Sequence, residues 1–138
     1  MKYLQGVILW IWQLPQNLIG LLALAFFPTT IPVDYRDDAH RRLPHSHLFF
    51  SSKMKGAVTL GRYIILRDVY FKDWDTWNHE RGHSIQSMIL GPLYLPVIGI
   101  PSLLWASLWY FGIVDDSKAS YYDFYPERWA DKLGGVKR

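Results

Sequence analysis

The stretch 77–86, WNHERGHSIQ, decides how the rest of the chain is interpreted, because it contains the pattern His-Glu-x-x-His. Residues able to cap a helix N-terminus precede it at 73–76, and Gly91-Pro92 follows it as a strong stop signal. The sequence therefore predicts a helix that begins within 73–76 and ends by Leu90.

This predicted helix brings two imidazoles and a carboxylate together. His79 and His83 lie one turn apart on one face, so both can reach the same metal ion. Gln86 continues that face and is expected beside the two ligands. Glu80 lies about 100° around the helix, beside the ion, where a general base takes a proton from a metal-bound water. Gly82 costs about 1 kcal/mol against Ala in a helix interior, which indicates that another segment packs closely there.

A catalytic zinc site needs a third protein ligand and a fourth coordination position that is open to water or substrate. The chain has ten Asp but only two Glu, and the second Glu, Glu127, lies in a short predicted helix. Pro126 at its first position and Gly134 just beyond its end delimit that helix. Asp131 follows one turn after Glu127, where its carboxylate can accept a hydrogen bond from a ligating imidazole. Ala130 is small enough to let two helices approach.

Two uncharged apolar stretches flank this region. The first, 3–27, is long enough to span a bilayer, but polar residues and a proline interrupt its middle. A kinked spanning helix, two half-helices in the membrane interface, a cleaved signal peptide and a buried helix of a soluble protein all fit this pattern. The interrupting residues are Gln13, Pro15, Gln16 and Asn17.

The second apolar stretch, 88–114, contains three prolines. They predict a short segment ending near Leu90, a bend over 91–101 and a helix over about 102–112, too short to cross a membrane. The stretch lies between His83 and Glu127, which must meet to bind one metal ion. It therefore has to start and finish on the same side of the membrane. A hairpin or re-entrant path is therefore expected rather than one crossing.

The sequence is interpreted as one domain, 1–138, which is mainly α with a small β-hairpin or strand. The segments 57–60 and 63–66 are rich in β-branched and aromatic residues, and they form either a hairpin turning at Gly61-Arg62 or one bulged strand. Their edge offers a place for an extended peptide to pair. The expected divisions are an apolar anchor, a polar region with strands and the His-Glu helix, an apolar hairpin, and a C-terminal third-ligand segment: 1–28, 29–87, 88–114 and 115–138.

Composition narrows the partners. The chain carries a net charge of +3 and no cysteine, which excludes disulfides and thiolate metal sites. So small a basic excess suits an anionic membrane surface and does not predict nucleic acid binding. Aromatic residues make up 17% of the chain, which favours a membrane interface. Since cations follow the first apolar stretch closely and only Lys2 precedes it, a spanning stretch would put the polar region in the cytoplasm. The cations that follow are Arg36, Arg41 and Arg42.

Two further groups of polar residues carry weaker signals. One is a histidine-rich, loop-like segment, interpreted as an interfacial loop with a second metal site as the alternative: His40, His45 and His47. The other is a set of tyrosines before the Glu127 helix, any of which is a candidate donor to an oxyanion: Tyr121, Tyr122 and Tyr125.

The pattern His79-Glu80-x-x-His83 followed by Glu127-x-x-Ala130-Asp131 resembles the gluzincin zinc metallopeptidases. It is similar to membrane-associated branches such as the CAAX-prenyl endopeptidase-like enzymes, and also to small bacterial zincin-like proteins. The resemblance implies a minimal zincin-like core with apolar membrane-associated helices. It implies zinc held by His79, His83 and Glu127, with Glu80 as general base and acid and with Asp131 outside the ligands.

We therefore expect a zinc metallopeptidase at a membrane, in the bacterial inner membrane with its site on the cytoplasmic side. Its partners would be a peptide or protein substrate and membrane lipid. The alternative is a zinc-binding membrane scaffold or interaction protein without hydrolytic activity.

Overall fold

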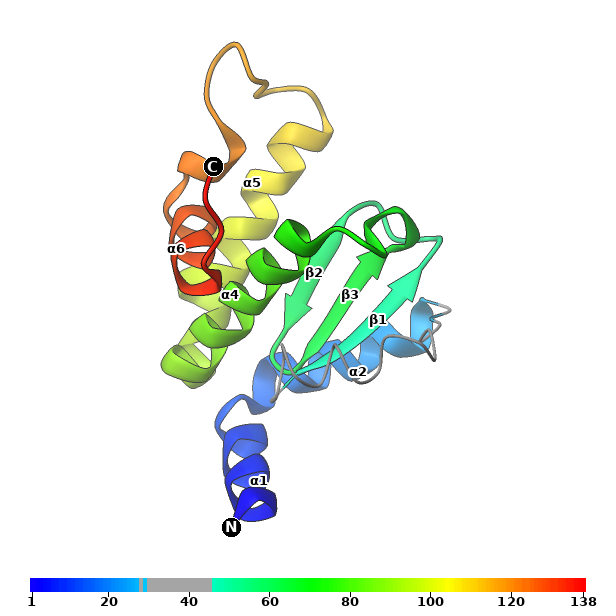
Figure 1. The fold of residues 1–138 in the computed structure, drawn as a ribbon, viewed down its shortest axis with the longest axis vertical. Coiled ribbons are helices and arrows are strands. Elements are labelled where there is room, and N and C mark those ends of the chain that lie inside the picture. The colour runs from blue at the N-terminus through cyan, green and yellow to red at the C-terminus, as the bar shows by residue number, and fades with distance from the viewer. Residues whose placement is uncertain (28, 30–45) are drawn as a thin grey trace.

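A computed structural model describes residues 1–27, 29 and 46–138. The chain is mainly helical with one three-stranded sheet, so the predicted fold class is confirmed at that level (Figure 1). The helices are α1 Lys2–Trp12, α2 Leu14–Phe26, α4 Trp74–Leu90, α5 Ile100–Tyr110 and α6 Tyr125–Gly134, and the strands are β1 His47–Ser51, β2 Ala57–Leu60 and β3 Tyr63–Arg67. Short helical turns lie at η2 Asp68–Tyr70, η3 Gly91–Leu93, η4 Leu95–Gly99 and η5 Tyr121–Asp123.

The sheet has the order β1-β3-β2. β2 and β3 are antiparallel and joined at Gly61, whose φ of 66° suits a tight turn, so the hairpin is confirmed and the single bulged strand is wrong. β1 was not predicted, and it pairs in parallel with β3. His47, expected in a loop, opens this strand, because Leu48 and Phe50 alternate into the core. His40 and His45 lie outside the described residues, as do the three arginines after the first apolar stretch.

Both faces of the sheet are covered. Ile64 and Leu66 pack with Trp77 of α4 on one face, and Ile65 is fully buried on the other. α2 runs beneath that second face, where Gly20 lies against Tyr63 (Figure 1). The sheet thus fixes α4 from one side and leaves the opposite side of α4 for α6.

The first apolar stretch forms two helices that meet at 89°. Its polar interruption is buried: Gln16 donates to the Ser87 hydroxyl at 2.9 Å and to the Gly91 carbonyl at 2.8 Å. Ser87 in turn donates to Gln13 at 2.6 Å, and Asn17 accepts from the backbone N–H of Arg62 at 2.9 Å. These polar side chains therefore dock the bend onto the end of α4 and onto the hairpin turn.

Length and composition set what these helices can do in a bilayer. Among the described residues no single helix is both long and apolar enough to cross one. α1 and α2 meet that requirement only when they are taken together.

The second apolar stretch corrects one expectation. The bend is confined to 91–94, and the chain is helical from Leu95 through Tyr110, so the predicted bend as far as Pro101 is wrong. Pro101 is accommodated because the π-helical segment η4 precedes it, which relaxes the hydrogen-bond ladder where a proline N–H is missing. After α5 the chain returns towards α4 and continues into α6 (Figure 1).

The two helices that carry the predicted ligands, α4 and α6, approach very closely. A Cβ on Gly82 would lie 1.9 Å from the Ala130 carbonyl oxygen, and one on Gly134 would lie 1.9 Å from the Asn78 carbonyl oxygen. The expected close contact at Gly82 and the approach at Ala130 are confirmed. α6 ends at Gly134, and the left-handed residue is Gly135, one position later than predicted.

We expect Gly82→Ala to destabilise the protein by about 3 kcal/mol, because its methyl group overlaps a backbone carbonyl and forces α6 away. Higher helix propensity offsets about 1 kcal/mol of the cost. The free energy of unfolding by urea measures this. Gly6→Ala is the matched control, since a Cβ there meets nothing within 4 Å. A Gly82→Ala protein as stable as the wild type would contradict the packing described.

Candidate metal centre

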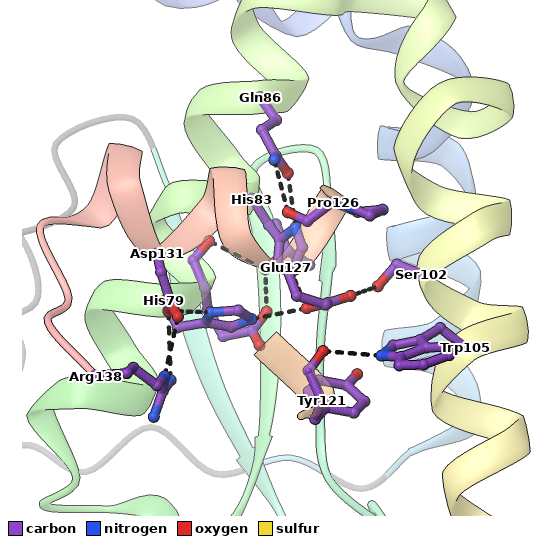
Figure 2. Close-up of polar contacts among 12 residues, drawn as sticks. His79, His83, Gln86, Ser102, Trp105, Tyr121, Pro126, Glu127, Asp131 and Arg138 are labelled. Carbon is purple, nitrogen blue, oxygen red and sulfur yellow. Dashed lines mark hydrogen bonds and ion pairs between the residues drawn. The ribbon is translucent and has the colours of Figure 1, made fainter. Parts of the chain in front are cut away.

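Three side chains from α4 and α6 converge on one point (Figure 2). The Nε2 atoms of His79 and His83 lie 3.0 and 3.1 Å from Oε2 of Glu127. All three residues are buried, with at most 5% of their surface exposed. The structure thus brings together the predicted ligands in a group that can hold a metal ion.

The outer nitrogens of both imidazoles are held by acceptors. His79 Nδ1 lies 2.7 Å from Oδ1 of Asp131, and an ionised carboxylate only accepts, so this nitrogen carries the proton. His83 Nδ1 lies 2.7 Å from Oε1 of Gln86, whose amide nitrogen donates to the Pro126 carbonyl at 2.9 Å. Asp131 and Gln86 therefore occupy the outer positions expected of them.

This hydrogen bonding fits a cation at the centre. With a proton on each Nδ1, the Nε2 atoms of His79 and His83 face the Glu127 carboxylate oxygen, and each would present a lone pair there once it gives up its own proton. Three electron-rich atoms this close repel one another unless a positive charge lies between them. The donor set, two nitrogens and one oxygen, is one that zinc accepts.

The protein's own charges favour positive charge at this point. Burial lowers the pKa of His79, but the hydrogen bond to Glu127, the charge of Glu80 and the bond to Asp131 outweigh it and raise that pKa to about 9. Burial raises the pKa of Glu127, but hydrogen bonds from His79 and His83 hold it well below its ordinary value. A proton and a metal ion therefore compete for the same place.

Glu80 lies beside the three converging residues rather than among them. Its carboxylate is buried, and Oε2 accepts a 2.5 Å hydrogen bond from the Thr59 hydroxyl on β2. Its charge is close enough to His79 to raise the pKa of that residue. One carboxylate oxygen of Glu80 is thus anchored by the sheet.

Three contacts at the centre had no signal in the sequence. The Ser102 hydroxyl on α5 donates to Oε1 of Glu127, the oxygen that does not face the imidazoles (Figure 2). Thr59 holds Glu80 from an apolar strand. Arg138 donates to both oxygens of Asp131, at 2.9 and 3.3 Å. Ser102 and Thr59 lie 25 and 21 residues from their partners, and Arg138 lies beyond the end of α6, so helical spacing does not reveal these contacts.

The three tyrosines fall in different places. The Tyr125 hydroxyl donates to the Val97 carbonyl at 2.5 Å. The Tyr122 ring meets the His79 ring edge to face at 5.4 Å and carries the Arg138 guanidinium at 3.3 Å from its centroid. Burial, followed by the charges of Glu127 and Glu80, raises the pKa of Tyr121. Tyr121 and Tyr122 therefore border the site, and Tyr125 is committed elsewhere.

Asp131→Asn is expected to weaken metal affinity by about 10- to 100-fold, the usual effect of losing a carboxylate partner of a ligating imidazole. The amide removes the charge that stabilises His79 and competes poorly for its Nδ1 proton. Competition with a chromogenic chelator measures the affinity. Asp123→Asn, the same change at an exposed acid of η5, is the control and should leave affinity unchanged. Equal affinities for the two variants would remove Asp131 from the site.

Comparison of the chain with models of known families, with curated proteins and with solved structures found no match. The gluzincin resemblance therefore remains a prediction based on the few residues that carry it. The geometry of the centre is what supports a function.

Proposed function

We propose that this chain is a membrane-associated zinc metallopeptidase. The observation that supports it best is the convergence of two imidazole nitrogens, from His79 and His83, and one carboxylate oxygen, from Glu127. Glu80 lies beside them on α4, the helix that carries the two histidines. Two His and one Glu satisfy three positions of tetrahedral zinc and leave the fourth for water or substrate.

Zinc in this site would lower the pKa of a bound water towards about 7 and polarise a substrate carbonyl. Glu80 would accept the proton of that water and return it to the leaving amine. Thr59 keeps one Glu80 oxygen hydrogen-bonded, so the carboxylate presents its other oxygen in a constant orientation. Tyr121, whose phenol is protonated at neutral pH, is the candidate donor to the developing oxyanion.

We propose that the substrate binds as an extended peptide paired with the edge strand β2. One backbone group of that strand is already occupied. The Tyr94 hydroxyl already donates to the Thr59 carbonyl at 3.1 Å. A substrate that pairs with this carbonyl must therefore displace Tyr94. Pairing along β2 without that displacement would use only the remaining backbone groups of the strand.

The apolar helices support the membrane part of the proposal. α1 and α5 contain no buried residue, although both are strongly apolar, and α1 projects from the rest of the molecule (Figure 1). Runs of exposed apolar side chains this long mark a surface that binds another apolar phase. These exposed apolar helices support a lipid bilayer as the partner. The cations that follow the first apolar stretch in the sequence favour an orientation with the site on the cytoplasmic side of a bacterial inner membrane.

The function is tested by incubating the zinc-loaded, detergent-purified chain with a mixture of unfolded proteins and sequencing the new amino termini by mass spectrometry. We expect new termini that vanish with a chelator and return with zinc. Metal uptake without any new termini would contradict the peptidase.

The burial of all three ligands favours one alternative, a zinc-binding membrane scaffold or interaction protein. The Glu127 side chain is 1% exposed and its second oxygen is already bonded to Ser102. A structural zinc site is closed in this way, whereas a hydrolytic site admits water to the metal. Retained zinc with no exchangeable fourth ligand, observed by spectroscopy of a cobalt-substituted protein, would favour the scaffold.

A further inference from the structure

A second feature of the molecule lies away from the metal centre, between α1 and the β2–β3 turn. It is a pocket of about 360 Å³, within the size range of sites that hold small ligands. Its lining is one face of α1, at spacings of one, four, five and eight residues, together with the turn residue: Lys2, Tyr3, Gly6, Val7, Trp10 and Arg62. We call it the α1–turn pocket.

The charged side chains that line the α1–turn pocket are all positive. Lys2 and Arg62 are its only ionisable groups besides the Tyr3 phenol, and none of the six lining residues is acidic. The Nε atom of Arg62 is buried and has no hydrogen-bond partner among the described residues. A buried, unpaired donor of this kind costs free energy until an acceptor reaches it. The N-terminus of α1 has no side-chain cap, which adds partial positive charge beside Lys2.

The rest of the lining is apolar, and the surroundings are too. Tyr3, Val7 and Trp10 form the wall, and Leu4 and Ile8, next to them on α1, are 62% and 57% exposed. A free inorganic anion would gain nothing from this apolar wall. An anionic headgroup attached to an acyl chain satisfies both the cations and the wall.

We propose that the α1–turn pocket binds one anionic phospholipid, with the phosphate between Lys2 and Arg62 and the acyl chain along Tyr3 and Val7. The inference rests on the membrane association in the proposed function, and it does not depend on zinc or on hydrolysis. Such a lipid would hold α1 against the hairpin turn. Because the same turn bonds to Asn17 at the start of α2, it would also set the level of the protein in the bilayer.

The test is native mass spectrometry of the detergent-purified full chain, titrated separately with phosphatidylglycerol, phosphatidylcholine and inorganic phosphate. We expect one phosphatidylglycerol per chain, bound at least about tenfold more tightly than phosphatidylcholine. Lys2→Gln and Arg62→Gln should each weaken it about fivefold. The same spectra count bound zinc, so loss of the lipid site and loss of the metal site are read independently.

Two variants separate the pocket from general surface charge. Gly6→Leu keeps every charge but fills the pocket, since a Cβ at Gly6 meets nothing within 4 Å, and it should abolish the preference for phosphatidylglycerol. Lys53→Gln makes the same charge change as Lys2→Gln at the opposite end of the sheet, and it should have no effect. Equal weakening by Lys53→Gln, unchanged binding in Gly6→Leu, or full displacement by inorganic phosphate would each overturn the proposal.

Discussion

Glu127→Ala is expected to abolish stoichiometric metal binding, lowering affinity by more than the roughly 100-fold that follows loss of an outer partner. Glu127 is the one anionic ligand of the proposed site, and its Oε2 lies within 3.1 Å of both imidazole nitrogens. His83→Ala should have a comparable effect, because only two ligands then remain. Metal content of the purified protein by mass spectrometry, together with a chelator competition, measures both.

A matched variant separates coordination from packing. Glu127→Ala also empties a buried position and leaves the Ser102 hydroxyl without its acceptor. Glu127→Gln keeps the volume and still accepts from Ser102, but it lacks the charge. His47→Ala, on β1 and exposed, controls for removing any histidine. A folded Glu127→Gln protein that retained one zinc at wild-type affinity would show that the ligand set is wrong.

Glu80→Gln is expected to keep its zinc and to lose about 100- to 10,000-fold in kcat, the usual contribution of a positioned general base. The amide preserves the size of the side chain and the Thr59 contact at Oε2, but it takes no proton from water. The kcat and the zinc content are measured on the same preparation, with the peptide that the cleavage survey identifies as substrate.

Thr59→Val tests the same role of Glu80 with a smaller expected effect. It removes the hydroxyl that anchors Glu80 without changing the shape of the strand, and a loss of about tenfold in kcat is expected. Asp75→Asn, at an acid in the first turn of α4, is the control for the charge lost in Glu80→Gln. Glu80→Gln with wild-type turnover would leave the base unassigned, whereas loss of zinc in that variant would make Glu80 part of the binding site instead.

Much of the site was accessible from the sequence because its spacing is local. Helical periodicity alone puts His79 and His83 on one face, and the cap at Asp73 and the stop at Gly91 bound α4 where they were expected. Gly82 marked the close approach of a second helix, since a glycine there has no helical advantage. The hairpin was one of two alternatives that the sequence left open, and the two-residue turn that favours it is a property of neighbouring residues.

Other features were decided only by the tertiary structure. β1 owes its existence to pairing with β3. Ser102 and Thr59 reach Glu127 and Glu80 from segments 25 and 21 residues away, and Arg138 reaches Asp131 from beyond the end of α6.

The polar break of the first apolar stretch shows the difference most clearly. In the sequence it indicates only an interruption, whereas in the structure Gln16 is fully buried against the end of α4, more than 70 residues away. Spacing along the chain determines which side chains share a face of a helix. Which faces then meet depends on how all the elements pack together, and no short stretch of sequence contains that information.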